Sequence, residues 1–226
     1  MLSAAQVDPD FFDRFTRPTW DLPLWRSLVE GLGGPVLELG CGTGRVLADL
    51  HARGHEAYGV EREPALAARA RAGLGEAGGA RVWTADWLRE PPRRRFPLVL
   101  IPCNTLSLFS DPAPALAAAA GYLAPGGALF FDLVVPGGRP WGAPPYTWSG
   151  RTEALEEGGR YHPDVGRHDG WMRSGDQRTT RTTWYRPLGE WPGLIEAAGL
   201  QHVRTFGPDG APADDSASIA VLFARG

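Results

Sequence analysis

Short apolar segments and helical patterns alternate through the first two thirds of this chain. Compact apolar runs occupy residues 36–39, 57–60, 96–101 and 128–135, and the stretches between them place apolar residues at helical spacing. A continuous apolar run is typical of a strand that is buried on both faces of a parallel sheet. The alternation therefore predicts an α/β fold built on a parallel sheet.

The N-terminal segment, residues 8–32, is too apolar to be a free tail. From Leu24 to Leu32, after Pro23, the spacing predicts an amphipathic helix that packs on the sheet. The aromatic residues before it either close over a bound cofactor or belong to the core, and both interpretations remain open.

Residues 136–186 interrupt the alternation and are dominated by glycine, proline and aromatic residues. The alternating pattern of residues 178–185 predicts antiparallel strands, with turns at Asp169-Gly170 and at Ser174-Gly175-Asp176. We interpret this region as a small inserted sheet that crosses above the carboxyl ends of the main strands. A structural flap or a dimer contact is the alternative.

Length and charge narrow the class of protein. A chain of 226 residues is long enough for one sizeable α/β core and short for two, so we predict a single domain over residues 1–226. The net charge is −3 and there is no lysine, which argues against a nucleic-acid partner. The sequence contains neither a signal peptide pattern nor a membrane-length apolar run, and we expect a cytoplasmic protein.

The most informative stretch is Pro35–Val46, in which an apolar run leads into three alternate glycines and then into a helical pattern. Glycine accepts positive φ without strain and lets a ligand lie against the backbone. The turn opens at a helix N-terminus, which favours an anionic, nucleotide-like ligand. A dinucleotide fingerprint needs a third glycine at position 45, and Arg45 stands there.

The string Glu-x-Gly-x-Gly-x-Gly, Glu38 to Gly44, resembles motif I of the class I S-adenosylmethionine (SAM) dependent methyltransferases. The longer string GPVLELGCGTGRV is similar to the small-molecule branch of that superfamily. The resemblance implies a Rossmann-like α/β fold: a mainly parallel seven-stranded sheet, helices on both faces and an antiparallel C-terminal edge hairpin over residues 200–206 and 218–223. It also implies SAM as cofactor and S-adenosylhomocysteine (SAH) as product.

Acidic residues at the next two strand ends support this resemblance. Glu61 follows the second strand, where a carboxylate can accept both ribose hydroxyls, although an acid there also serves as a helix N-terminal charge. The resemblance makes Asp86 the acceptor for the adenine amino group, and a cap of the next turn is its alternative role. The implied cofactor-binding residues are Glu38, Gly40, Cys41, Gly42, Gly44, Arg45, Glu61, Arg62, Asp86, Trp87, Pro102, Cys103 and Asn104.

Pro102-Cys103-Asn104 follows the apolar strand 96–101, whose end lies beside the reactive sulfonium in this family. Pro-Cys also occurs in cytosine methyltransferases, but the Glu-Asn-Val string or second cysteine that accompanies it there is missing. The Asp/Asn-Pro-Pro-Tyr/Phe loop of amino-group nucleic-acid methyltransferases is missing too. We expect Cys103 to be a small packing residue and Asn104 to be a polar wall of the pocket. The two cysteines cannot form a disulfide framework or a zinc site, and no metal is predicted.

The inserted region 136–186 is interpreted as a cap over the substrate and residues 1–32 as a helical lid. Their aromatic richness motivates a predicted substrate pocket of Trp20, Tyr146, Trp148, His162 and Trp171. Methyl transfer from a sulfonium depends mainly on positioning, so we assign no catalytic residue. By residue type, a general base would be His162, Asp132, Tyr146 or His168.

The predicted function is SAM-dependent methyl transfer to nitrogen or oxygen of a small molecule, by a monomer or homodimer without a membrane partner. A non-catalytic SAM-binding protein is the alternative, because fold does not imply function. A nucleic-acid methyltransferase is a weaker third interpretation.

Overall fold

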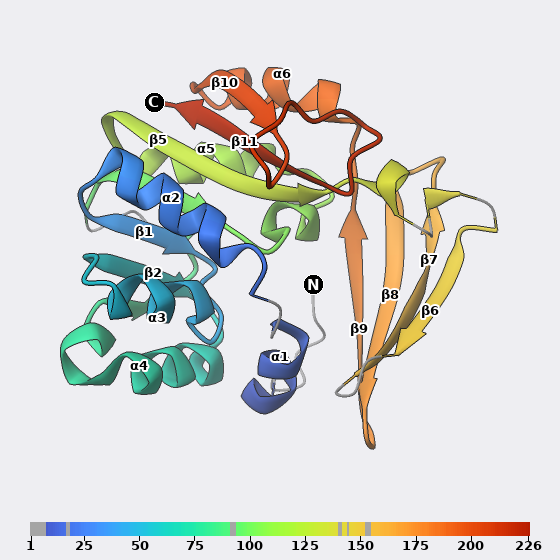
Figure 1. Cartoon of the computed structure of the whole chain (residues 1–226), viewed down its shortest axis with the longest axis horizontal. Helices are drawn as coiled ribbons and strands as arrows, with labels where there is room; N and C mark the ends of the chain where they lie inside the picture. Colours follow the sequence, from blue (N-terminus) through green and yellow to red (C-terminus); the bar gives the residue numbers. More distant parts are fainter. Residues whose placement is uncertain (1–7, 17–18, 91–93, 140–141, 144, 152–154) are drawn as a thin grey trace.

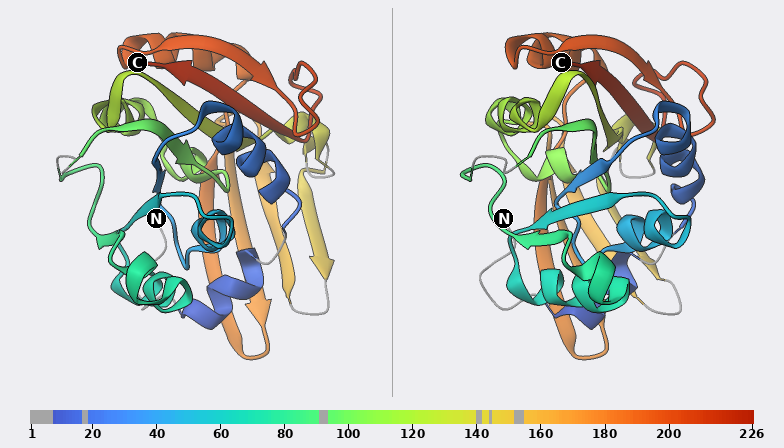
Figure 2. Two further views of the ribbon diagram at one scale, coloured as in Figure 1. Left: turned by 60° about the vertical axis from the view of Figure 1, so that its left-hand side comes forward. Right: turned by 90° about the vertical axis from the view of Figure 1, so that its left-hand side faces the viewer.

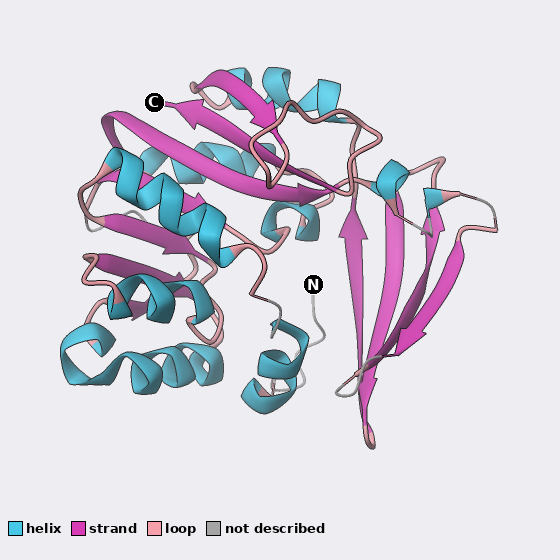
Figure 3. Cartoon of the chain, viewed as in Figure 1, coloured by secondary structure: helices cyan, strands magenta, loops and turns pink. Residues whose placement is uncertain are grey.

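The structure is a computed structural model that describes residues 8–16, 19–90, 94–139, 142–143, 145–151 and 155–226, with the backbone alone at Trp148. Its elements are drawn in Figure 3. The helices are α1 (Pro9–Thr16), α2 (Leu22–Leu32), α3 (Arg45–Ala52), α4 (Pro64–Gly79), α5 (Ala113–Gly121) and α6 (Trp191–Ala197), with short 3-10 turns at Thr105–Leu108, Pro136–Gly138 and Leu188–Glu190. The strands are β1 (Val36–Leu39), β2 (Ala57–Glu61), β3 (Val82–Thr84), β4 (Phe96–Ile101), β5 (Leu123–Val134), β6 (Thr147–Arg151), β7 (Glu156–His162), β8 (Arg167–Ser174), β9 (Gln177–Trp184), β10 (Gln201–Phe206) and β11 (Ile219–Arg225).

Seven strands form the main sheet, in the order β10-β11-β5-β4-β1-β2-β3. β1 pairs in parallel with β2 and β4, and β3 and β5 extend the sheet in parallel on either side. β11 runs antiparallel to both β5 and β10. The predicted class I methyltransferase topology, with its antiparallel C-terminal hairpin, is therefore confirmed.

Helices cover both faces of this sheet, as Figures 1 and 2 show. One face of the sheet packs against α2, α3 and α4, and the other packs against α5 and α6. Along β1, Val36 belongs to the core on the side of α2, α3 and α4, whereas Leu37 and Leu39 belong to the core on the side of α5 and α6. All four residues of β1 are buried on both sides, which explains why its sequence is a continuous apolar run apart from Glu38.

The inserted region forms a second sheet of four antiparallel strands in the order β6-β7-β8-β9. Figure 1 shows this sheet standing across the carboxyl ends of the main parallel strands, with α1 beside β9. Phe11 of α1 and Met172 of β8 share a small apolar cluster that joins α1 to this sheet. The expected inserted antiparallel sheet is present, and we call it the cap sheet.

One predicted turn is wrong. Asp169-Gly170 lies in the middle of β8, and the chain instead turns between β7 and β8 at residues 163–166, while the predicted turn at Ser174-Gly175-Asp176 joins β8 to β9. Gly170 pairs with Gly159, and a Cβ at Gly159 would lie 2.5 Å from Nε2 of His168. Gly159 therefore makes room for the His168 imidazole beside the strand. A glycine in the sequence can mark either such a close approach or a turn, so Asp169-Gly170 by itself does not show where the chain reverses.

Two helix ends are set by the chain that follows them. α4 reaches Gly79, with a kink where Gly75 takes φ +66°. α5 ends at Gly121, and β5 begins at Leu123. None of the described helices has the length and apolar character that a membrane crossing requires.

Candidate functional site

A cavity opens at the carboxyl edge of the parallel strands, where open α/β sheets bind their ligands. It holds about 1250 Å³ of space outside the atoms, including part that is open to solvent. The ends of β1, β2, β3 and β4 form one side, which we call the strand-end wall. α1 and β9 form the other side, which we call the roof. The lining residues are Phe12, Phe15, Thr16, Glu38, Gly40, Cys41, Gly42, Thr43, Arg45, Val46, Glu61, Arg62, Glu63, Leu66, Asp86, Trp87, Leu88, Pro102, Cys103, Thr105, Leu108, Phe109 and Arg181.

The glycine turn after β1 needs backbone conformations that favour glycine. Gly40, Gly42 and Gly44 have φ of +75°, +56° and +85°. A Cβ at Gly42 would lie 2.7 Å from Cε1 of Phe12, and one at Gly44 would lie 2.9 Å from Cβ of Ala70. The turn is thus pressed between α1 and α4, and a side chain at either position would displace a neighbour.

Glu61 holds this turn in place while it faces the cavity. Its Oε2 accepts a hydrogen bond from the Gly42 amide at 2.9 Å, and its Oε1 accepts one from the Glu63 amide at 2.8 Å. Burial raises the pKa of the Glu61 carboxyl, and these two amides act in the opposite direction. The carboxylate therefore links the β1 and β2 loops at the cavity surface.

Glu38 is a buried acid that keeps one oxygen free for a ligand. The residue is 4% exposed and lines the cavity, and its Oε2 has no hydrogen-bond partner among the residues that the structure describes. Burial raises the pKa of Glu38 to about 8, and Arg45 partly opposes that shift. An unpaired buried acceptor is costly, so a donor from a bound molecule would complete this site.

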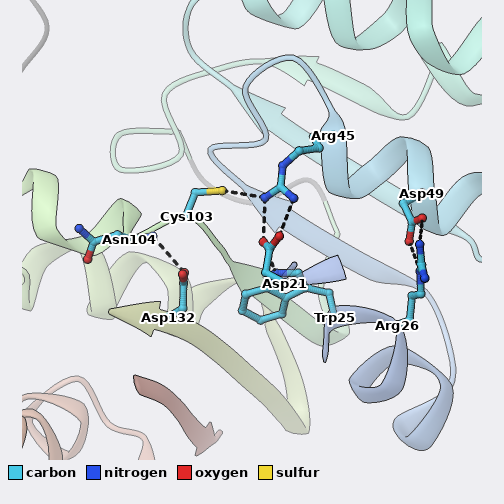
Figure 4. Close-up of polar contacts among 8 residues, drawn as sticks. All are labelled: Asp21, Trp25, Arg26, Arg45, Asp49, Cys103, Asn104 and Asp132. Atoms are coloured by element: carbon cyan, nitrogen blue, oxygen red, sulfur yellow. Dashed lines mark hydrogen bonds and ion pairs between the residues drawn. The ribbon is translucent and has the colours of Figure 1, made fainter. Parts of the chain in front are cut away.

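Arg45 ties three parts of the chain together (Figure 4). Its guanidinium donates two hydrogen bonds to the buried Asp21 carboxylate, at 2.6 and 2.7 Å, and Nη2 also lies 3.1 Å from Cys103 Sγ. The Trp25 indole donates to the same carboxylate at 2.9 Å. Arg45, which stands where a dinucleotide fingerprint has its third glycine, thus connects the N-terminal segment to the end of β4.

The β4 loop corrects two expectations. Cys103 is accessible from the cavity and lines it, so it is not a packing residue. Asn104 is buried outside the lining: its Oδ1 accepts hydrogen bonds from Ser107 Oγ at 2.6 Å and from the Val134 amide at 3.0 Å. Both residues take positive φ, 62° and 57°, and the Asn104 amide donates to Asp132, so Asn104 fixes the turn that presents Cys103.

The β3 loop brings the other predicted polar residues to the strand-end wall. Asp86 lines the cavity, and its Oδ1 accepts a hydrogen bond from the Leu88 amide at 3.1 Å, which caps the following turn. Trp87 is buried edge-on to Phe109, with ring centroids 6.2 Å apart. Arg62 reaches the cavity from β2, and Pro102 from β4.

The predicted substrate residues do not gather at this cavity. Trp20 is 51% exposed and lies in a separate groove with residues 207–219. Tyr146 packs edge-on against Tyr161, with ring centroids 6.3 Å apart, and His162 places Nε2 3.1 Å from an Asp169 carboxylate oxygen.

Trp171 lies on the face of β8 opposite to the buried His168 and Met172, under the guanidinium of Arg178 at 5.4 Å. Aromatic richness alone could not reveal which face of each strand turns inward. The side chain of Trp148 lies outside the described residues.

Two candidate bases by residue type are buried and lie outside the lining. Burial raises the pKa of Asp132 to about 7, and burial lowers the pKa of His168 to about 4. Neither one lines the cavity, and we assign no general base.

Arg181 is the residue that sequence analysis missed. It comes from β9 and is the one cap-sheet residue among the described residues that line the cavity. The alternation of Arg178–Tyr185 carried the signal, because Arg181 shares its strand face with the buried Thr183 and Tyr185.

Comparisons with known proteins support the topology. Residues 36–127 match a family model described as a methyltransferase domain. The CcbJ methyltransferase from Streptomyces caelestis is similar in structure, with a TM-score of 0.78 and 23% identity over 92% of this chain and 96% of that one. The chain matches no curated protein sequence.

Two further solved structures have the same fold. CalS10, an amino pentose methyltransferase from Micromonospora echinaspora, was solved with SAM bound; it has a TM-score of 0.68 and 20% identity over 95% of each chain. The sugar N-methyltransferase KedS8 from Streptoalloteichus sp. also has a TM-score of 0.68, with 21% identity over 97% of this chain and 94% of that one.

Proposed function

We propose that this chain, which carries a methyltransferase domain at residues 36–127 on the class I methyltransferase fold, transfers the methyl group of SAM to a small molecule. The observation that carries the proposal is the cavity at the strand-end wall. There a glycine turn, the partly unpaired Glu38 carboxylate and two further acids, Glu61 and Asp86, meet at successive strand ends.

The cavity residues fit this cofactor. SAM has an ammonium group and a sulfonium centre, and the buried Oε2 of Glu38 lacks a donor among the described residues. We assign Glu38 to the ammonium, Glu61 to the ribose hydroxyls and Asp86 to the adenine amino group. Each is a carboxylate that accepts hydrogen bonds from those donors. Trp87 and Phe109 supply apolar contact on the same side.

When bound, SAM supplies a methyl group that is already electrophilic. The chain's own contribution is to fix the reacting atoms and exclude water. Phe12 and Phe15 of α1 cover the cavity opposite the strand-end wall, and Cys103 and Thr105 line it at the end of β4. We propose that residues 8–32 act as a lid and the cap sheet as a cover over the acceptor.

The acceptor atom is proposed as nitrogen or oxygen. Two structural neighbours are described as an amino pentose methyltransferase and a sugar N-methyltransferase, which favours a nitrogen acceptor on a small polar molecule. A non-catalytic SAM-binding protein is the competing function, and turnover assays with a library of amino sugars and small amines separate the two.

Calorimetric titration with SAM, SAH and NAD tests the cofactor. We expect the adenosyl ligands to bind with Kd in the micromolar range, about −8 kcal/mol, and NAD not to bind. Glu61→Ala should weaken SAH binding about 100-fold, because it removes both the ribose acceptor and the hydrogen bonds to the Gly42 and Glu63 amides. Glu76→Ala, at an exposed site on α4, is the matched control. Tight binding of NAD alone would refute the proposal.

A further inference from the structure

The cap sheet delivers one cation to the cavity. On β9, Arg181 shares its face with Thr183 and Tyr185, which are buried against the rest of the protein, whereas Arg178 lies on the other face against Trp171. In the pairing of β8 with β9, Arg181 lies opposite Gly170, which has no side chain to cover the guanidinium. The arginine can therefore extend to the cavity lining.

The Arg181 guanidinium has no anionic partner within the described ranges. It makes no ion pair and no side-chain hydrogen bond there, and its close contact is the Phe15 ring, whose centroid lies 4.7 Å from Cζ. Glu157 lies on the same face of the cap sheet, but the two residues form no ion pair within 4.0 Å. Burial lowers the pKa of Arg181, and the nearby Tyr185, Cys103 and Glu157 only partly oppose that shift.

Arg45 differs from Arg181 because it has a carboxylate partner. Arg45 also lines the cavity, but the Asp21 carboxylate binds both of its terminal nitrogens and leaves it neutralised. The Arg181 guanidinium is half-buried and has no carboxylate partner among the described residues, and its planar fork of donors matches a carboxylate or phosphate. The cavity thus retains one unsatisfied site for an oxyanion.

Arg181 and Glu38 reach the cavity from opposite sides. Arg181 comes from β9 in the roof, where its Cζ lies 4.7 Å from the centroid of the Phe15 ring, whereas Glu38 comes from β1 in the strand-end wall. We therefore expect the two groups to contact different parts of the bound molecules.

We propose that Arg181 binds an oxyanion, a carboxylate or phosphate, carried by the methyl acceptor. The inference rests on the proposed function and adds the chemical class of the acceptor: an anionic small molecule held by the cap sheet with its nucleophile toward the end of β4. Arg181 is then the residue that determines acceptor charge.

The test uses fluorinated probes that share a ring and differ in charge. 4-Fluorobenzoate, 4-fluorophenyl phosphate and neutral 4-fluorobenzamide are titrated by ¹⁹F NMR into the full chain saturated with SAH. We expect wild type to bind at least one anion more tightly than the amide. Arg181→Met should weaken that anion at least tenfold, and Arg178→Met, the matched control on the opposite face, should leave it within twofold. Circular dichroism and thermal unfolding verify that both variants are folded.

Three results would overturn the inference. The first is that neither anion binds better than the amide, and the second is that Arg181→Met binds the anion as tightly as wild type does. The third is that Arg181→Met weakens the binding of SAH tenfold but not that of 5′-methylthioadenosine, which lacks the carboxylate. The last result would assign Arg181 to the cofactor. Failure of wild type to bind SAM or SAH would refute the proposed function instead, and the same anion titration without SAH would still test Arg181.

Discussion

The two sides of the cavity are stabilised in opposite ways. At the strand-end wall, the buried Glu61 carboxylate accepts a hydrogen bond from the Gly42 amide, and Arg45 donates to the buried Asp21 behind it. In the roof, α1 is held by exposed polar contacts: Arg14 donates to Ser174 Oγ at 2.6 Å, and Gln177 donates to Asp8 Oδ2 at 2.5 Å.

This difference has a thermodynamic consequence. Breaking a buried, paired interaction leaves an unsatisfied group, whereas an exposed group recovers its interaction with water. We therefore expect the roof to open at a lower cost in free energy than the strand-end wall. Three changes test this comparison, from the largest expected effect to the smallest.

Arg45→Met should give the largest effect. It leaves the Asp21 carboxylate buried and deprived of its guanidinium, and we expect the free energy of unfolding to fall by about 3 kcal/mol. Urea denaturation measures the loss. The double variant Asp21→Asn/Arg45→Met removes the stranded charge and should recover part of it. Equal losses in the single and double variants would contradict a buried-charge origin.

The pH dependence of stability tests the burial of Glu38. Its pKa is about 8 in the folded chain and 4.5 ordinarily, so the folded state binds the proton more tightly. The stabilisation that comes from the protonated Glu38 is then fully present below pH 4.5 and is lost as pH rises through 8. Between pH 5 and 8 we expect the free energy of unfolding to fall, because the folded chain holds a proton on Glu38 that the unfolded chain releases. Asp132, with a pKa of about 7, contributes in the same direction.

Glu38→Gln should flatten this pH profile, and Glu30→Gln, at an exposed site on α2, should leave it unchanged. The comparison needs only denaturation curves at several pH values. A profile for Glu38→Gln that parallels wild type would mean that Glu38 is ionised at no cost in the folded state.

Arg69→Met should give the smallest effect. Arg69 forms ion pairs with Asp10 at 2.7 Å and Asp13 at 2.9 Å, but its side chain is 48% exposed. Exposed pairs contribute little, and we expect no resolvable change in the free energy of unfolding and less than a threefold change in SAH affinity. Denaturation and calorimetry in low salt measure both. A loss of stability as large as that of Arg45→Met would show that the roof is held as firmly as the strand-end wall.

The sequence predicts the strand-end wall better than the roof because the wall is encoded locally. The glycines after β1, the acid after β2 and the acid after β3 each follow directly from an apolar run, so their spacing places them at one edge. The sequence does not predict the buried position of Asn104, because its role depends on Val134, a residue of the neighbouring strand β5.

The roof depends on contacts between distant segments. The inward position of Arg181, the outward position of Trp171 and the exposure of Trp20 depend on which face of each element turns toward the core. An aromatic composition carries no such information. Strict alternation over Arg178–Tyr185 did predict the strand, and a register anchored on a buried residue such as Thr183 would have predicted Arg181 as well.

The contact of Phe12 with the glycine turn also determines how fast a ligand exchanges. Because the Phe12 ring lies where a Cβ of Gly42 would be, α1 rests directly on the surface that a cofactor would occupy. We therefore expect a molecule that leaves the cavity to require separation of α1 from this turn. If it does, the opening rate of one short helix would limit the residence time of the proposed cofactor.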